Sequence, residues 1–154
     1  MRSGALQESP RLRVAAAVTR EGRLLLVRHR KEGEGEYYLL PGGGVKWGES
    51  MVEALHREVR EETGLEVQAG RLLCVSETFY PDGSRHIVNL VFKGMERGGE
   101  IRPSSDPRVK GCAFVELGEL QRVRLYPPMA AFLQRACAPG YRGGGVYLGR
   151  LWRD

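Results

Sequence analysis

The chain has 154 residues and a formal net charge of +5 at pH 7, and 42% of its residues are hydrophobic and 28% charged. This composition is typical of one globular domain of ordinary size and excludes a largely disordered chain. The longest apolar runs are far shorter than the roughly 20 residues that span a bilayer, so the sequence predicts no membrane-spanning segment.

The N-terminal residues and the cysteines indicate the compartment. Residues 1–10 are polar and lack the apolar stretch of a signal peptide, so we expect a flexible N-terminal lead. Cys74, Cys112 and Cys137 are widely spaced and form no C-x-x-C pair, which favours free thiols over a disulfide framework or a zinc site. Together these features predict a cytoplasmic protein.

The positive charge resides almost wholly in arginine side chains, which are scattered along the chain. A positive field would attract a polyanion such as a nucleotide, whereas the scattering favours a purely compositional origin. A nucleic-acid partner would need a basic track with interleaved aromatic residues, and the sequence does not show one. We therefore expect a small-molecule partner, and neither nucleic acid nor a membrane.

The first part of the chain predicts strands and a glycine-rich loop. The segment 11–30 has apolar and β-branched runs on either side of a turn at 20–22, which predicts two strands. Residues 33–44 predict a surface loop that contains a short strand at 37–40 and breaks at Pro41.

A helix is expected next, because Ser50 can cap a helix that runs to about Thr63, with Gly64 in the C′ position. At 100° per residue its apolar residues form one stripe, and three carboxylates lie on the neighbouring arc. These carboxylates belong to Glu58, Glu61 and Glu62. Like charges at this spacing repel one another, which favours a cation among them; the alternative is a solvated acidic face balanced by arginines.

The remaining segments predict a hairpin, a further strand and a closing helix. Residues 65–80 and 85–94 predict long strands joined by a tight turn. A strand at 111–117 and a helix within 127–138 follow. The glycine-rich residues 141–154 form either a tail or an extra strand. Strands mixed with two helices predict an α/β or α+β sandwich.

A hard cation would suit the carboxylates of the predicted helix. Mg²⁺ takes oxygen ligands, typically one or two carboxylates together with substrate phosphates and water. The three consecutive glycines 42–44 precede the helix, and a glycine loop can add a backbone carbonyl because no side chain blocks the approach. The sequence thus favours a metal site where the loop meets the helix.

The spacing of the helix and its flanks is specific. Gly43 is followed after five residues by Glu49, and after seven more by the run REVREETGL at 57–65. This pattern over residues 43–65 resembles the signature box of the Nudix hydrolases at every fixed position. The resemblance implies an α/β fold, namely a Nudix-type α/β/α sandwich with a mixed sheet. In this fold the box forms a catalytic loop–helix–loop, and the domain is expected to span residues 11–140. It also implies hydrolysis of a nucleoside diphosphate linked to another moiety.

The same resemblance implies Mg²⁺ as the cofactor, with Mn²⁺ as a substitute, and gives individual residues their roles. Arg57 resembles the arginine that holds the box glutamates, and Glu49 resembles its structural partner. The expected general base is Glu58, with Glu61 as the second choice. The resemblance implies three catalytic residues, Glu58, Glu61 and Arg57. The implied metal ligands are Glu58, Glu61, Glu62 and the carbonyl of Gly42. The implied structural residues are Gly43, Glu49 and Gly64.

Acids outside the box are secondary candidates for the base. Glu77, Glu116 and Glu119 are such candidates, although each is more typical of a solvated surface. Many relatives carry an acid where Arg108 stands, and this departure weakens the case for a fourth acidic ligand from that loop. Asp106 is the alternative in the same loop.

Four residues outside the helix are candidate substrate contacts, namely Trp47, Arg28, Tyr80 and Lys46. Trp47 and Tyr80 could stack on a base, while Arg28 and Lys46 could meet phosphates. Trp47 could equally fill the edge of the core. Pro81 resembles a proline at about the same distance from the box in the ADP-ribose pyrophosphatase group, and Tyr80 resembles a tyrosine at about the same distance in the diadenosine polyphosphate group. The same two residues also suit a hairpin turn.

ADP-ribose or a similar nucleotide derivative is the first expectation for the substrate. The alternatives are a hydrolase that removes oxidised or non-standard nucleoside triphosphates, a diadenosine polyphosphate hydrolase, and a binding module that senses a nucleotide without cleaving it. The resemblance is also compatible with a homodimer.

Overall fold

The computed structural model describes residues 9–151 of the chain. The expected N-terminal lead falls on residues 1–10, of which 1–8 lie outside the described residues, as do residues 152–154 of the expected tail. The elements in chain order are β1 (Arg11–Arg20), β2 (Arg23–Lys31), β3 (Gly35–Leu39), β4 (Gly42–Gly44), α1 (Met51–Thr63), β5 (Leu65–Phe79), β6 (His86–Gly99), β7 (Val109–Glu116), the 3-10 helix η1 (Leu117–Arg122), α2 (Ala130–Ala136) and β8 (Val146–Arg150).

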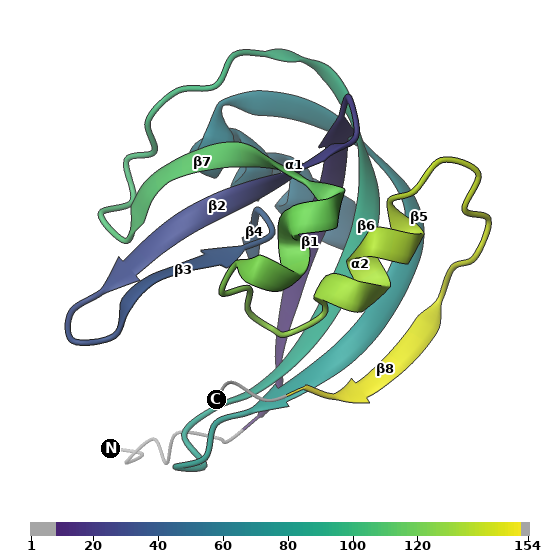
Figure 1. Cartoon of the computed structure of the whole chain (residues 1–154). Helices are drawn as coiled ribbons and strands as arrows, with labels where there is room; N and C mark the ends of the chain where they lie inside the picture. Colours follow the sequence, from purple (N-terminus) through teal and green to yellow (C-terminus); the bar gives the residue numbers. More distant parts are fainter. Residues whose placement is uncertain (1–8, 152–154) are drawn as a thin grey trace.

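Within residues 9–151, eight strands form one mixed sheet (Figure 1). Its main path runs β3-β2-β1-β6-β5-β8, with β4 paired to β1 and β7 paired to β2. The pairs β1/β6 and β5/β8 are parallel, whereas the other neighbours are antiparallel. The strand β1 is central because it contacts β2, β4 and β6 at once.

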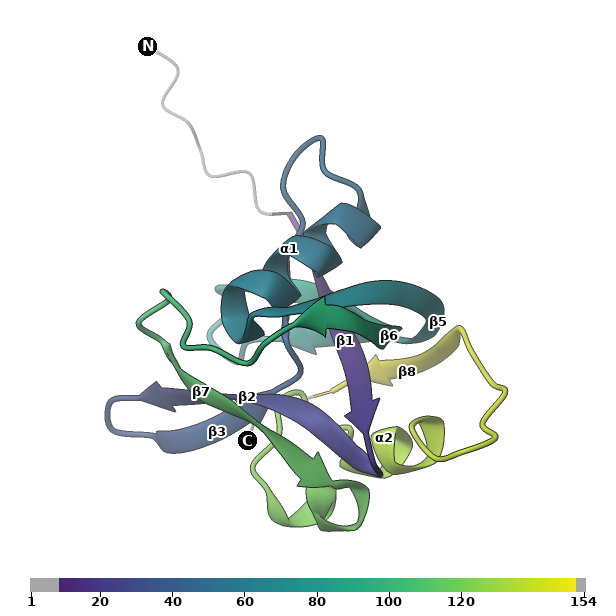
Figure 2. The ribbon, with the colours of Figure 1, turned by 90° about the horizontal axis from the view of Figure 1, so that it is seen from above.

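Two apolar clusters lie on opposite faces of the strands, and each contains one helix. Leu55 and Val59 of α1 pack with Val14 and Leu25 of β1 and β2. Phe132 and Leu133 of α2 belong to the other cluster, together with alternate residues of the same two strands. The view in Figure 2 shows α1 and α2 on opposite sides of β1 and β6. This arrangement confirms the expected α/β/α sandwich.

Most of the locally encoded elements are where the sequence predicts them. β1 and β2 meet at a two-residue turn that contains Gly22, and β5 and β6 form the expected long hairpin. Helix α1 begins after Ser50, whose side chain accepts a hydrogen bond in a complete capping box. It ends at Gly64, which has the left-handed conformation (φ 84°) expected of a C-terminal cap.

The structure corrects several expectations. Gly42–Gly44, expected to be loop, is a short strand because it pairs with Arg13–Ala15 of β1. The short strand expected at 37–40 is Gly35–Leu39, and α2 begins only at Ala130, after the two prolines. The helix η1 was not expected, and residues 146–150 form the strand β8 on β5. No helix in the described part of the chain has the length and apolar character needed to cross a membrane.

Candidate active site

Helix α1 presents its carboxylates at the edge of the core. Leu55 and Val59 are fully buried against the sheet, which fixes the rotation of the helix. Glu62, next to this apolar stripe, is only 8% exposed, while the side chain of Glu61 is 55% exposed. The three acidic side chains therefore extend from the core to the solvent along one side of the helix.

Arg57 and the backbone of Gly42 are the partners of these carboxylates. Glu62 Oε1 accepts a hydrogen bond of 2.7 Å from the backbone N–H of Gly42. Glu58 Oε1 accepts one of 2.7 Å from the guanidinium of Arg57, and Glu61 Oε2 lies 3.5 Å from the same guanidinium. One arginine thus contacts two of the three acids, while the glycine strand holds the third.

Arg57 is fixed in turn by the loop that precedes the helix. Its Nε and Nη2 donate to the two oxygens of Glu49 at 2.8 and 2.9 Å, and Nη2 also donates to the carbonyl of Gly44 at 3.1 Å. The hydrogen bonds from Arg57 lower the pKa of Glu49 to about 2. This bidentate pair holds Arg57 in the position that Glu58 requires.

The glycines of β4 leave room for the acidic side chains. A Cβ at Gly43 would overlap the carboxylate of Glu58, and a Cβ at Gly42 would overlap the backbone of β1. At Gly44 a Cβ would meet nothing within 4 Å. Two of the three consecutive glycines are therefore required by close packing, one of them directly by Glu58.

The electrostatics around Glu58 suit a bound cation. Burial raises the pKa of Glu58, and the charges of Glu62 and Glu61 act in the same direction, while Arg57 opposes them. No three His, Cys, Asp or Glu side chains among residues 9–151 converge closely enough to form a metal cage. The acids fit an open Mg²⁺ site, because each Mg²⁺ usually takes one or two carboxylates and completes its shell with phosphates and water.

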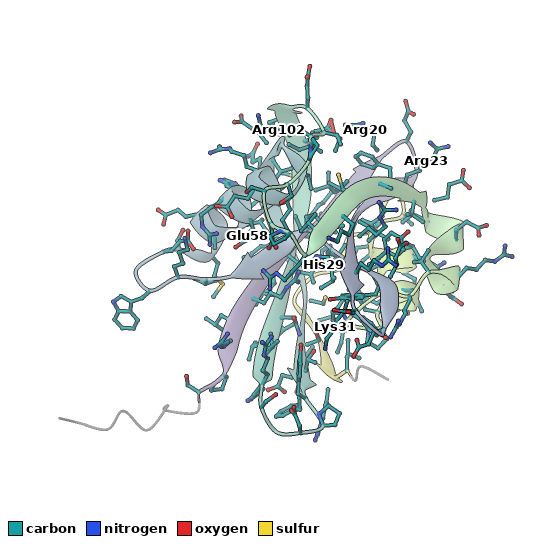
Figure 3. All side chains as sticks on the ribbon, turned by 90° about the vertical axis from the view of Figure 1, so that its left-hand side faces the viewer. Arg20, Arg23, His29, Lys31, Glu58 and Arg102 are labelled. Atoms are coloured by element: carbon teal, nitrogen blue, oxygen red, sulfur yellow. The ribbon has the colours of Figure 1, made fainter. Side chains whose placement is uncertain are left out.

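A cavity of about 350 Å³ opens beside these acids. Gly43, Glu58 and Glu62 line one side of it. Figure 3 shows Glu58 from α1 and His29 from β2 near the same central region, and His29 also lines the cavity. Further lining comes from β1, β5, β6 and the segment before α2, with the residues Arg13, Thr78, Tyr80, Asn89, Tyr126 and Pro127.

Of the four expected substrate contacts, only Tyr80 lines the cavity. Trp47 is fully exposed on the loop between β4 and α1. Arg28 donates to the carbonyl of Lys110 at 2.7 Å, which directs its side chain away from the cavity lining. The backbone N–H of Lys46 donates to Glu49 at 3.1 Å, and its side chain is not part of the lining.

The secondary candidates for the base have partners of their own. Asp106 lines the cavity, where its hydrogen bond with Arg108 lowers the pKa of Asp106 to about 2. Glu77 contacts His86 at 3.1 Å, outside the cavity. Glu116 and Glu119, which form ion pairs with Arg23 and Arg122, likewise do not line it.

The sequence alone indicates Tyr37 as an aromatic residue that could stack on a base, but it does not single out His29, Tyr126, Arg13 or Asn89 as cavity residues. His29 stacks on Tyr37 with ring centroids 5.5 Å apart, and Tyr37 packs against Tyr126 at the same separation. Arg13 and Asn89 are paired across β1 and β6. The sequence did contain an indication that Arg13 is unusual. It lies on the same face of β1 as Ala15 and Ala17, which are apolar and buried, so a charged residue there is unexpected.

Comparison with known proteins points to one family. Residues 9–136 match the NUDIX domain family. An ADP-ribose pyrophosphatase of Methanocaldococcus jannaschii is 31% identical over 74% of this chain and 66% of its own length. An 8-oxo-dGDP phosphatase of Mus musculus is 32% identical over 70% of this chain and 31% of its own length. The chain thus spans less than two thirds of the length of either relative.

A solved structure gives the same result at the level of the fold. The crystal structure of a MutT NUDIX hydrolase from Burkholderia pseudomallei superimposes with a TM-score of 0.72 and 31% sequence identity. The match covers 82% of this chain and 98% of that structure.

Proposed function

Because the chain belongs to the NUDIX hydrolase family, we propose that it is a Mg²⁺-dependent pyrophosphohydrolase that cleaves a nucleoside diphosphate linked to another moiety. The observation that carries the proposal is the position of Glu58 and Glu62, which line a cavity that is also lined by aromatic residues and arginines. Such a cavity offers carboxylates for a metal, a cation for phosphates and rings for a base.

The proposed metal ligands are Glu58, Glu61 and Glu62, with the carbonyl of Gly42 as a further donor and Mn²⁺ as a substitute for Mg²⁺. When bound, Mg²⁺ would neutralise phosphate charge and lower the pKa of a coordinated water. Arg57 keeps Glu58 in place, as its hydrogen bond of 2.7 Å indicates. Gly43 provides the space that the carboxylate occupies.

In the proposed reaction a water oxygen attacks one phosphorus atom of the pyrophosphate link. The bond from that phosphorus to the bridging oxygen breaks, and the proton of the water passes to a carboxylate. Glu58 is the proposed base because it is half-buried in the cavity wall, and Glu61 is the second choice. Positioning of the reactants is the other main contribution that the protein makes.

ADP-ribose is the first proposed substrate. A cavity of about 350 Å³ is near the lower end of the usual range for small-molecule sites, roughly 300–1,000 Å³, and it would hold one nucleotide half of such a substrate. The relative named ADP-ribose pyrophosphatase supports this choice. The relative named 8-oxo-dGDP phosphatase supports the second candidate, a hydrolase of oxidised nucleotides.

The test is Mg²⁺-dependent hydrolysis of ADP-ribose, diadenosine polyphosphates, nucleotide sugars, and normal and oxidised nucleoside di- and triphosphates, with chromatographic identification of products. Glu61→Gln should reduce turnover at least about 100-fold, because it removes a proposed metal ligand. Glu66→Gln is the matched control: Glu66 follows the same helix and pairs with Arg60 at 3.3 Å on the surface.

The products distinguish the candidates. AMP with ribose 5-phosphate would support ADP-ribose, whereas release of phosphate or pyrophosphate from oxidised nucleotides would support the second candidate. Tight nucleotide binding without turnover of any substrate would contradict the hydrolase proposal and favour a sensor. A homodimer and a cytoplasmic location stay predictions, of which the first is measured by light scattering during size-exclusion chromatography.

A further inference from the structure

Arg13 is a half-buried cation in the wall of the cavity. It lies on the central strand β1, and its Nη2 donates to the backbone carbonyl of Leu40 at 3.0 Å. No carboxylate among residues 9–151 lies within the 4.0 Å of an ion pair with this guanidinium. A guanidinium has five N–H donors, so one carbonyl leaves most of its donors unused.

A charge in this position is costly without a ligand. Desolvation by burial lowers the pKa of Arg13, and the negative charges of Glu62 and Glu58 act against this effect. Buried charges in proteins are normally paired and hydrogen-bonded, because loss of hydration is otherwise uncompensated. The two acids whose charges act on Arg13 have other hydrogen-bond donors, Glu62 the N–H of Gly42 and Glu58 the guanidinium of Arg57.

The sheet register places Arg13 between the metal-side acids and the rest of the cavity. Its neighbour on β4 is Gly44, which follows the glycine that contacts Glu58. Its neighbour on β6 is Asn89, which is 4% exposed and donates to Thr78 Oγ1 at 3.1 Å. An anionic group bound by Arg13 would therefore lie close to Gly44, while the acids that we assign to the metal lie beside the neighbouring Gly43.

The other arginines of the cavity do not share this environment. Arg108 forms an ion pair of 2.8 Å with Asp106, and Arg85 lies over the ring of Tyr80 at 5.4 Å from its centroid. Arg11 is exposed, two residues before Arg13 on the same face of β1. Only Arg13, among the cavity arginines that the structure describes, is both half-buried and without an anionic or aromatic partner.

We infer that Arg13 is a substrate-binding residue that receives a phosphate of a nucleoside diphosphate substrate, beside the strand β4 that contacts the proposed metal ligands. This inference rests on the proposed function, which supplies the substrate class. Arg13 is suited to the role because its planar fork can donate two parallel hydrogen bonds to one phosphate. It makes the site selective for phosphorylated ligands over neutral nucleosides.

The experiment measures binding of α,β-methylene ADP and of inorganic pyrophosphate by calorimetry in Mg²⁺, with Arg13→Gln, Arg13→Lys and wild type. Loss of a charge-assisted hydrogen bond predicts a roughly 10- to 100-fold higher Kd for both probes in Arg13→Gln. Arg13→Lys should recover part of the affinity, because lysine keeps the positive charge. The recovery should be incomplete, because lysine lacks the planar guanidinium that donates two parallel hydrogen bonds. A purely structural role would instead lower the unfolding temperature and give no recovery by lysine.

Arg20→Gln is the matched control, because Arg20 lies at the other end of the same strand and pairs with Glu96 at 2.6 Å. It should leave the Kd of both probes unchanged. Wild-type affinity in Arg13→Gln, or an equal loss in Arg20→Gln, would overturn the inference and leave the proposed hydrolase intact. If Arg13→Gln does not fold, an unchanged Kd in Arg13→Lys would overturn it. A wild-type protein that binds neither probe would contradict both proposals.

Discussion

At the level of single residues, the site depends on where side chains are absent as much as on where they are present. The carboxylate of Glu58 occupies the space that a side chain at Gly43 would fill. Arg57 donates a hydrogen bond of 2.7 Å to the same carboxylate. The position of Glu58 is therefore fixed by one missing Cβ and by one charged partner.

Gly43→Ala should consequently impair catalysis while the fold persists. The added Cβ would displace the Glu58 carboxylate, and misplacement of a catalytic group by about 1 Å can cost about 100-fold in rate. We expect kcat/KM to fall by at least 10-fold, with a circular-dichroism spectrum like that of the wild type. Gly44→Ala is the control, because its Cβ would meet nothing within 4 Å. Equal activity of the two variants would refute this account of Gly43.

Site residues that lie together on one helix could be predicted from the sequence, whereas those brought together by strand pairing could not. Glu58, Glu61 and Glu62 could be grouped from helical spacing alone, because the helix repeat places them on one arc. Arg13 and Asn89 could not, because they come from β1 and β6, and only the sheet register brings them together. A side chain that reaches a cavity from a strand depends on pairings that no local pattern encodes.

At the level of elements, helix α1 has strong signals at both ends. Ser50 accepts a hydrogen bond of 3.0 Å from the N–H of Glu53, and Glu53 accepts one of 2.9 Å from the N–H of Ser50. Gly64 closes the other end, where its N–H donates to the carbonyl of Arg60 at 2.9 Å. These short-range contacts explain why the helix bounds could be predicted from the sequence, whereas those of the short strands β3 and β4 could not.

Ser50→Ala should remove the cap and destabilise the protein without altering the chemistry. Loss of a serine cap typically lowers the free energy of unfolding by about 1 kcal/mol. Urea denaturation should show a lower midpoint with the same slope, and kcat should stay close to the wild-type value below the transition. Ser105→Ala is the control, because Ser105 is exposed and does not cap a helix. A midpoint equal to that of the wild type would show that the capping box contributes nothing.

At the level of the whole molecule, the sheet divides the core into an α1 side and an α2 side. The sequence predicts the elements of the α1 side better than those of the α2 side. The α1 side is built largely from a helix and strands that are close in sequence, and its apolar stripe was evident. The α2 side also receives the C-terminal segment, since Leu148 of β8 packs against it. The parallel pairing of β8 with β5 joins segments about 70 residues apart, which explains why tail and extra strand remained alternatives in the sequence.

The free thiols report on the integrity of this core. Cys74 is fully buried, and burial raises its pKa to about 12; burial likewise raises the pKa of the half-buried Cys137 to about 11. Both thiols therefore keep their protons in the folded state at pH values where the unfolded chain, with thiol pKa values near 8.5–9, begins to lose them. Because the unfolded state binds fewer protons there, the free energy of unfolding should fall as the pH rises from about 9 towards 11.

Alkylation with iodoacetamide at pH 8 measures how far the thiols stay protonated in the folded protein, since only the thiolate reacts. In the folded protein Cys74 and Cys137 should be alkylated at least about 100-fold more slowly than in urea, as judged by mass spectrometry of peptides. Cys112, half-buried in β7 on the other side of the sheet, has a pKa that burial raises less far and should react first. Equal rates in folded and unfolded protein would contradict a closed core on the α2 side. Rapid alkylation of Cys137 alone would instead locate an opening at the end of α2, where this thiol follows the last helical residue.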